Sequence, residues 1–222
     1  MRTEAKMTPA QSRSETAPGI TRRQKRRFRF LWLAAPVLIG LLLTTRSAWP
    51  DNHLFASLIQ QFGAIYVFAF IAGRSWSTLY MGSTPDVLLI TDGPYRHLRN
   101  PLYFFSATGL LGVGMLWKSL ILGAGLFGFV LLTFYFVILG EEKFLENRFG
   151  DTFRAYCKAV PRLLPSLKAR IPATHGETTP FSPSALWDFF RDTSWLLLVL
   201  PGSVLVDWAQ RAGWLPVLLR LY

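Results

Sequence analysis

The charged residues that could perform chemistry gather in two short segments, each beside an apolar run. Residues 91–103 read TDGPYRHLRNPLY and contain Asp92, Arg96, His97 and Arg99. A guanidinium offers paired donors that match a carboxylate, and a neutral imidazole exchanges a proton near neutral pH. The alternative is a basic loop end that only follows the charge rules of membrane topology. In both interpretations these side chains lie at the face of a membrane.

The second segment begins with Glu141 and Glu142, directly after the apolar run 120–139. Negative charge at the C-terminal end of a helix is unfavourable unless the helix continues or a cation lies nearby. In the structural interpretation, both carboxylates are solvated and pair with Lys143 or Arg148. In the functional one, a carboxylate binds a cationic ligand group.

Together the two segments provide opposite charges that suit the ammonium and carboxylate of an amino acid moiety. S-adenosylmethionine carries both groups, a ribose diol and a sulfonium. The chain lacks the βαβ alternation of a Rossmann cofactor domain, so the GVG at 112–114 is interpreted as helix packing. Its single cysteine, Cys157, has no partner with metal-ligand spacing. We therefore expect no metal site.

Apolar helices must position these segments. Uncharged apolar stretches cover residues 30–45, 54–73, 102–117 and 120–139, and about 20 residues cross a bilayer. This pattern predicts an all-α fold, a polytopic membrane bundle with four to five spans and amphipathic C-terminal helices in the cytoplasm. The expected divisions are a disordered basic tail (1–27), a membrane-embedded core (28–165), a linker (166–183) and an apolar extension (184–222). The extension is expected to be a span, a re-entrant pair or an interfacial segment.

The charge distribution sets the expected orientation. The net charge of +11 is concentrated before the first apolar stretch, in the run TRRQKRRFR. Next to an apolar span, positive-inside topology and anionic lipids explain this run better than nucleic acid does. The N-terminus and both polar segments then face the cytoplasm, and Lys118 and Ser119 form a tight external turn. After Gly150, one helix face carries Phe153, Tyr156 and later apolar residues at helical spacing.

The residues GPYRHLRNPLY, followed by EEKFLENRFGDTFRAYCKAVPRLLP, resemble the isoprenylcysteine carboxyl methyltransferase and phospholipid methyltransferase superfamily over residues 54–165. This resemblance implies a membrane enzyme that uses S-adenosylmethionine and takes a lipophilic acceptor from the bilayer. Arg99, Glu142 and His97 are assigned to catalysis. The implied cofactor-binding residues are Tyr95, Arg99, Asn100, Pro101, Tyr103, Glu141, Glu142 and Arg162.

One position departs from the family pattern. Asn100 stands where eukaryotic carboxyl methyltransferases of the family have histidine. Asparagine does not titrate near neutral pH, so position 100 is not expected to act as acid or base, and prenylcysteine becomes a weaker candidate substrate. A carboxylate acceptor needs no base, whereas an amine or hydroxyl acceptor would need His97 or a glutamate.

Two other functions fit parts of the sequence. A membrane enone or steroid reductase would bind the 2′-phosphate of a reduced nicotinamide cofactor through Arg148, Arg154, Lys158 or Arg162. A non-catalytic scaffold or transporter would use the charges for topology. Transport normally places ionisable residues at mid-membrane, whereas the expected spans carry none and have only Gln60 and Gln61 as strongly polar mid-span residues. The expected partners are a lipophilic acceptor, membrane lipids and, through the extension, a second copy of the chain.

Overall fold

The computed structural model describes residues 36–50, 53–81, 89–166, 187, 189–191 and 193–222. The chain divides into two units, residues 1–43 and 44–222. In the first unit residues 36–43 are helical, within the predicted span 30–45. The predicted tail 1–27 and nearly all of the predicted linker 166–183 lie outside the described residues. The second unit contains both charged segments.

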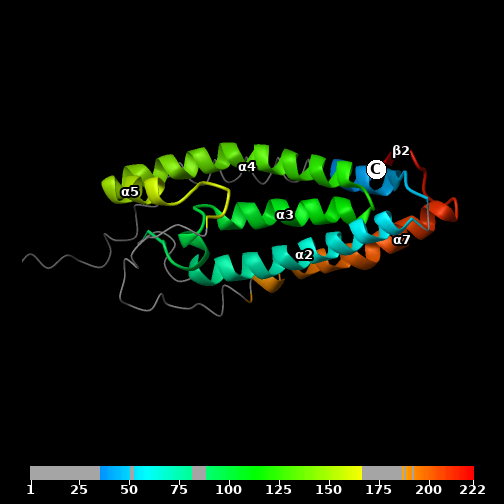
Figure 1. Cartoon of the computed structure of the whole chain (residues 1–222), viewed down its shortest axis with the longest axis horizontal. Coiled ribbons are helices and arrows are strands. Elements are labelled where there is room, and N and C mark those ends of the chain that lie inside the picture. The colour runs from blue at the N-terminus through cyan, green and yellow to red at the C-terminus, as the bar shows by residue number, and fades with distance from the viewer. Residues whose placement is uncertain (1–35, 51–52, 82–88, 167–186, 188, 192) are drawn as a thin grey trace, which may run out of the picture. The chain divides into compact units, whose positions relative to one another are not determined.

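Three helices form the centre of the second unit: α2 (Leu54–Met81), α3 (Pro101–Leu116) and α4 (Leu120–Phe149). Helix α3 contacts both α2 and α4, and it lies between them in Figure 1. Helices α2 and α4 are long and apolar enough to cross a membrane, whereas α3 is shorter. The predicted apolar stretches 54–73 and 120–139 are helical throughout, and the stretch 102–117 is helical as far as Leu116. Helix α2 continues beyond its predicted end and includes Arg74.

Local sequence explains where α3 begins and ends. The residue before a proline is disfavoured in helical geometry, so the helix starts at Pro101 after Asn100. At the other end Lys118 has a positive φ of 56°. The Ser119 side chain then accepts a hydrogen bond from the amide of Leu122 at 3.1 Å and caps α4. The predicted tight turn at Lys118 and Ser119 is confirmed.

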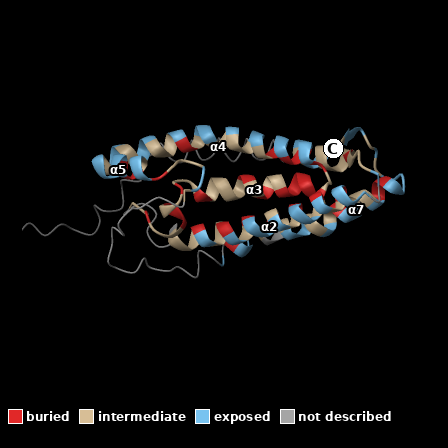
Figure 2. Ribbon diagram, viewed as in Figure 1, coloured by how far each residue is buried: buried red, intermediate tan, exposed pale blue. Residues whose placement is uncertain are grey.

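Glycines allow α3 to lie close to both neighbours. A Cβ on Gly112 would lie 2.7 Å from the carbonyl oxygen of Gly63 on α2. A Cβ on Gly114 would collide with the backbone of Gly123 on α4. The packing interpretation of the GVG sequence is therefore confirmed, and much of α3 is buried in Figure 2.

Large apolar side chains cover much of the outer surface of α2 and α4. Phe62 and Phe68 on α2 are exposed, as are Leu132 and Phe136 on α4. Such surfaces would be unfavourable in water and are typical of helices that contact lipid.

A short helix follows α4. Helix α4 ends at Gly150, whose φ is 54°, and α5 (Asp151–Ala159) begins directly after it. One face of α5 buries Phe153 and Tyr156, which form a cluster with Val160. The predicted amphipathic stripe is thereby confirmed, and it packs against the protein.

The C-terminal extension contains helical and extended parts. The 3-10 helix η3 (Ser194–Leu198) leads into α7 (Val199–Arg211), and the run Phe189–Arg211, which includes position 192 outside the described residues, is long and apolar enough to cross a membrane. Strand β2 (Leu219–Leu221) then pairs in parallel with β1 (Thr45–Ser47). The expectation of an all-α chain did not include these strands, because three residues are too few to show an alternating pattern.

Candidate functional site

The first charged segment begins with a fixed turn. The 3-10 helix η2 (Gly93–Arg96) starts at Gly93, whose positive φ of 58° favours glycine. Tyr95 follows and is buried, and the hydroxyl of Tyr156 on α5 donates to its carbonyl oxygen at 2.8 Å. Burial raises the pKa of both phenols, so Tyr156 stays protonated and keeps this hydrogen bond near neutral pH.

Backbone and side-chain hydrogen bonds join the first segment to the residues after α5. The amide of Arg99 donates to the carbonyl oxygen of Pro161 at 2.9 Å. The side-chain amide of Asn100 donates to the carbonyl oxygen of Arg162 at 3.2 Å. Asn100 therefore joins the two segments through a neutral hydrogen bond, a role that needs no titratable group.

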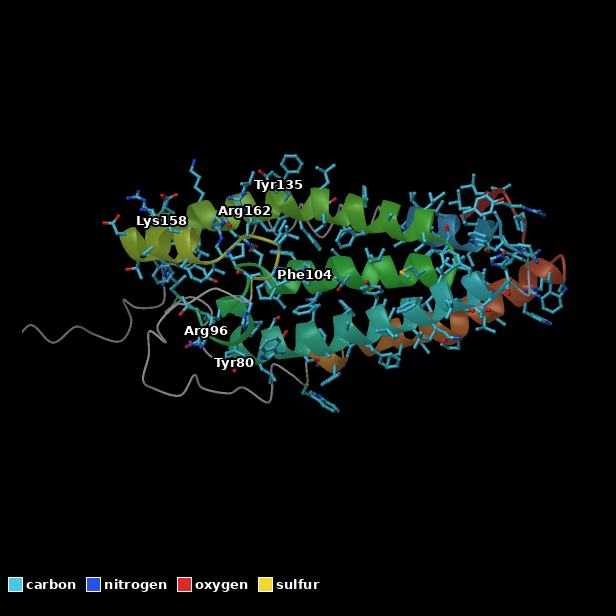
Figure 3. The ribbon with its side chains drawn as sticks, in the orientation of Figure 1. Tyr80, Arg96, Phe104, Tyr135, Lys158 and Arg162 are labelled. Atoms are coloured by element: carbon cyan, nitrogen blue, oxygen red, sulfur yellow. The ribbon has the colours of Figure 1, made fainter. Side chains whose placement is uncertain are left out.

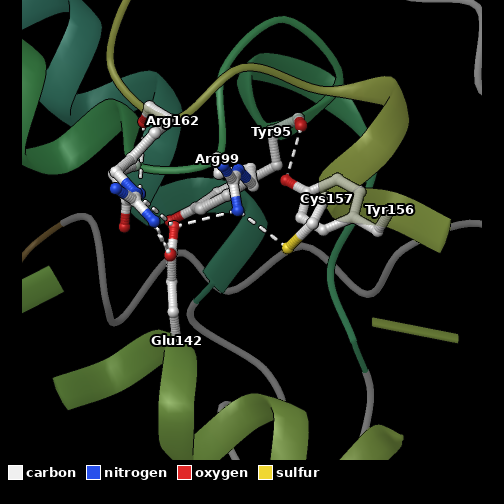
Figure 4. A network of polar contacts seen from close by, with 7 residues as sticks. Tyr95, Arg99, Glu142, Tyr156, Cys157 and Arg162 are labelled. Carbon is white, nitrogen blue, oxygen red and sulfur yellow. Dashed lines mark hydrogen bonds and ion pairs between the residues drawn. The ribbon is translucent and has the colours of Figure 1, made fainter. Parts of the chain in front are cut away.

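At this junction Glu142 binds two arginines (Figure 4). Arg99 Nη1 lies 3.0 Å from one carboxylate oxygen, and Arg162 Nη2 lies 2.7 Å from the other. Arg162 Nε also donates to the carboxylate at 3.1 Å, and these bonds raise the pKa of the Arg162 guanidinium. The side chains of Arg99 and Glu142 are each only 13% exposed. We call these three residues the Arg-Glu-Arg network.

A second carboxylate lies beside the network. The hydroxyl of Tyr103 on α3 donates to Glu141 at 2.7 Å, and the Tyr103 ring packs against Phe134 with centroids 4.7 Å apart. The Arg162 guanidinium lies over the ring of Tyr135, 5.6 Å from its centroid (Figure 3). Tyr103 thus contacts Glu141, and Tyr135 contacts Arg162.

Two predicted groups point to other partners. His97 Nδ1 lies 3.2 Å from the carbonyl oxygen of Ser166, and the His97 carbonyl accepts from the Ser166 amide. Arg96 pairs with Asp92 at 3.6 Å. Arg99, by contrast, lies in the Arg-Glu-Arg network.

Two residues near the network were not predicted as part of the site. Arg99 Nη1 donates to the sulfur of Cys157 on α5, and burial raises the pKa of this thiol despite the nearby arginine. Arg74 on α2 donates to Ser106 on α3 at 3.1 Å. The helical spacing after Gly150 placed Cys157 next to Tyr156 on the apolar face of α5, where it is half-buried, but no sequence pattern indicated Arg74.

Two of the four residues proposed for a nicotinamide phosphate make contacts away from the Arg-Glu-Arg network. Arg154 pairs with Glu146 and Asp151 in exposed ion pairs, and Arg148 lies over the ring of Phe149. Of these basic candidates, only Arg162 belongs to the network. Among the described residues there is also no group of three or more His, Cys, Asp or Glu that could hold a metal ion.

The fold and the site define an integral membrane protein of packed helices with an arginine and glutamate network at one end. Residues 37–152, just over half of the chain, match the sequence model of the family described as phospholipid methyltransferase. The chain belongs to this family, which confirms the resemblance to membrane methyltransferases.

Curated relatives give further context. The chain is 28% identical over 193 residues to the nickel-cobalt-cadmium resistance protein NccN of Alcaligenes xylosoxydans xylosoxydans, covering 86% of this chain and 88% of that protein. It is 32% identical over 142 residues to the cobalt-zinc-cadmium resistance protein CzcN of Cupriavidus metallidurans, covering 64% and 63%.

A third relative has a name that states a reaction. The chain is 36% identical over 96 residues to the protein-S-isoprenylcysteine O-methyltransferase of Schizosaccharomyces pombe, covering 42% of this chain and 40% of that protein. No solved structure matches the chain.

Proposed function

We propose that the chain is a membrane methyltransferase that uses S-adenosylmethionine and acts on a lipophilic acceptor at the cytoplasmic membrane face. The observation that carries this proposal is Glu142 bound between Arg99 and Arg162, which unites both sequence segments at one end of the helices. Membership of the phospholipid methyltransferase family supports the reaction class.

The residues present fit the amino acid end of the cofactor. Two guanidiniums and one carboxylate leave the Arg-Glu-Arg network with a formal positive charge. The Nε of Arg99 is buried and has no hydrogen-bond acceptor among the described residues. Arg99 and Arg162 would hold the cofactor carboxylate, while Glu141 would receive its ammonium. An orphan donor of this kind costs about 1–3 kcal/mol, which a bound acceptor would recover.

The other predicted residues would shape the site. Pro101 and Asn100 fix the start of α3, buried Tyr95 supports the turn before it, and Tyr103 orients Glu141 through its 2.7 Å hydrogen bond. When bound, the cofactor supplies a methyl group made electrophilic by its sulfonium. The protein then acts by holding the reacting groups in line and by excluding water from them. His97 would serve as a base only for an amine or hydroxyl acceptor.

The path of the chain supports a C-terminal span. Ser166 is bound to His97 at the site end, whereas Leu219–Leu221 pairs with Thr45–Ser47 at the start of α2, which is the opposite end. The run Phe189–Arg211, which includes position 192 outside the described residues, lies between these two points of the chain and has the length and composition to cross a membrane. The basic N-terminal run favours the cytoplasm for the N-terminus. One predicted span, 30–45, precedes α2, so the end of α2 that lies at the site returns to the same side, and we assign the site end to the cytoplasm.

Calorimetric titration of the detergent-purified protein tests this proposal. S-adenosylhomocysteine and reduced nicotinamide dinucleotide phosphate are titrated in parallel. We expect saturable binding of the first ligand alone, with affinity in the micromolar range typical of enzyme ligands. Binding of the nicotinamide cofactor alone would instead favour the reductase, and binding of neither would favour a non-catalytic role.

A further inference from the structure

Arg74 is a charged residue inside the membrane helix α2, and the Arg-Glu-Arg network does not use it. Its Nη1 donates to the Ser106 hydroxyl at 3.1 Å, and its guanidinium lies over the rings of Phe70 and Phe189, 5.7 and 5.6 Å from their centroids. Its Nε is enclosed and has no acceptor among the described residues. No described carboxylate forms an ion pair with it, so its positive charge lacks a protein counter-charge in this part of the chain.

Such a group is costly without a partner. Arg74 lies in the last third of α2, before Met81, so the about 2.5–3.5 kcal/mol that insertion scales give for a charge at a helix centre is an upper bound for it. Charged residues within membrane helices commonly mark ligand or ion pathways. A snorkelling arginine would place its guanidinium in water at the membrane surface. The enclosed Nε and the two rings over Arg74 do not match that arrangement. The cation instead fits an anionic ligand.

The position of Arg74 relates it to the proposed site. Its partner Ser106 lies three residues after Tyr103 on α3, about 4.5 Å further from the end of the helix that carries the site. Residues three apart on a helix lie on related faces. Burial raises the pKa of Tyr95, and the charge of Arg74 opposes this effect. Arg74 is therefore close to the Arg-Glu-Arg network but deeper among apolar side chains.

We propose that Arg74 binds the anionic head of an amphiphilic acceptor whose apolar chain lies in the membrane. This inference rests on the proposed methyltransferase function and assigns it an acceptor-binding residue outside the Arg-Glu-Arg network. The head is a carboxylate or a phosphate, since a guanidinium pairs with both. The Arg-Glu-Arg network already contains a carboxylate, whereas no described carboxylate pairs with Arg74. We therefore assign the cofactor to the network and the head of the acceptor to Arg74.

The test uses the full chain in a nonionic detergent, with three probes of equal chain length: hexadecanoate, hexadecyl phosphate and uncharged hexadecanol. Calorimetry measures their binding, at a pH where both acids are ionised, to the wild type, Arg74→Gln and the control Arg148→Gln. Arg148 also lies over a phenylalanine ring, but it is exposed. S-adenosylhomocysteine is titrated into every protein.

We expect at least one anionic probe to bind the wild type and Arg148→Gln with equal affinity, and Arg74→Gln at least about tenfold more weakly, equivalent to about 1.4 kcal/mol. Hexadecanol should bind more weakly to the wild type than that probe does. The relative affinities of hexadecanoate and hexadecyl phosphate distinguish a carboxylate head from a phosphate head. S-adenosylhomocysteine should bind all three proteins within about twofold.

Other outcomes separate the two proposals. If neither anion binds the wild type, if Arg74→Gln binds them as the wild type does, or if hexadecanol binds equally well, the acceptor inference fails, while S-adenosylhomocysteine binding still supports the methyltransferase. If that nucleoside does not bind but anion binding depends on Arg74, the methyltransferase proposal fails and a lipid-anion site remains.

Two further variants keep the inference testable if Arg74→Gln does not fold. Arg74→Lys retains the charge but loses the planar fork, so we expect anion affinity to fall by about threefold or more. Unchanged affinity would contradict the inference. Arg74→Met removes the uncompensated charge, and a ligand-binding role predicts a higher melting temperature for the ligand-free protein. A purely structural role predicts a lower one.

Discussion

Glu142→Gln tests the Arg-Glu-Arg network most directly, because it removes the negative charge and preserves the shape. The carboxylate lies 3.0 Å from Arg99 and 2.7 Å from Arg162. Removal of one partner from a buried ion pair costs about 3–5 kcal/mol. Since the Arg162 side chain is 33% exposed, water compensates part of this loss, and we expect a decrease of about 2–4 kcal/mol in unfolding free energy.

A chain of this length changes its melting temperature by about 2–4 °C per kcal/mol, so Glu142→Gln should melt about 4–16 °C below the wild type. The assay is thermal unfolding in detergent, followed by circular dichroism. Calorimetry should also show at least about tenfold weaker S-adenosylhomocysteine binding, because the two arginines lose the group that orients them.

The matched control is Glu146→Gln. Glu146 lies one turn further along α4 and also pairs with an arginine, at 2.8 Å to Arg154, but that pair is exposed. We expect no measurable change in its melting temperature or ligand affinity. Equal melting temperatures for the two variants would refute the argument that burial makes the network strong.

Three further predictions concern other parts of the structure. Tyr103→Phe retains the ring but loses the hydrogen bond to Glu141, so S-adenosylhomocysteine affinity, measured by calorimetry, should fall by about threefold or more, and unchanged affinity would exclude an orienting role. Gly112→Ala should destabilise the fold by about 1–3 kcal/mol in thermal unfolding, whereas Gly128→Ala, which meets no atom within 4 Å, should not destabilise it. Burial raises the pKa of Cys157, so the midpoint of iodoacetamide alkylation against pH should lie higher in the native than in the unfolded protein. The raised pKa stabilises the fold in the thiol form, and this contribution is lost as pH rises through the native pKa.

Much of the fold followed from simple sequence patterns. Long uncharged stretches predicted the helices, and the observed start of α3 at Pro101 and end of α4 before Gly150 fall at residues that commonly bound helices. These features depend on local geometry and on apolar content, which a single sequence displays directly. The pairing of β1 with β2 joins residues far apart in the chain through backbone hydrogen bonds, and no local pattern encodes that contact.

The candidate site was predictable only in part. Opposite charges in two segments indicated that Glu142 and Arg99 could belong to one site, and the VPR sequence added Arg162. The sequence did not reveal that Glu142 binds both arginines, since this depends on how the chain returns after α5. The predicted roles of these residues in cofactor binding and catalysis stay predictions.

Arg74 shows why hydropathy alone gives an incomplete picture of a membrane site. The first charged residue after an apolar stretch usually marks the membrane boundary, and residues 54–73 predicted a span that ends before Arg74. Helix α2 instead continues to Met81, the guanidinium of Arg74 lies over two aromatic rings, and its Nε is buried. A charge that only marked the boundary would need no such contacts. The structure therefore contains two separate cationic groups: the Arg-Glu-Arg network, which includes its own carboxylate, and Arg74, which has no described counter-charge. An enzyme that transfers a methyl group from a polar cofactor to an acid in the membrane would need both.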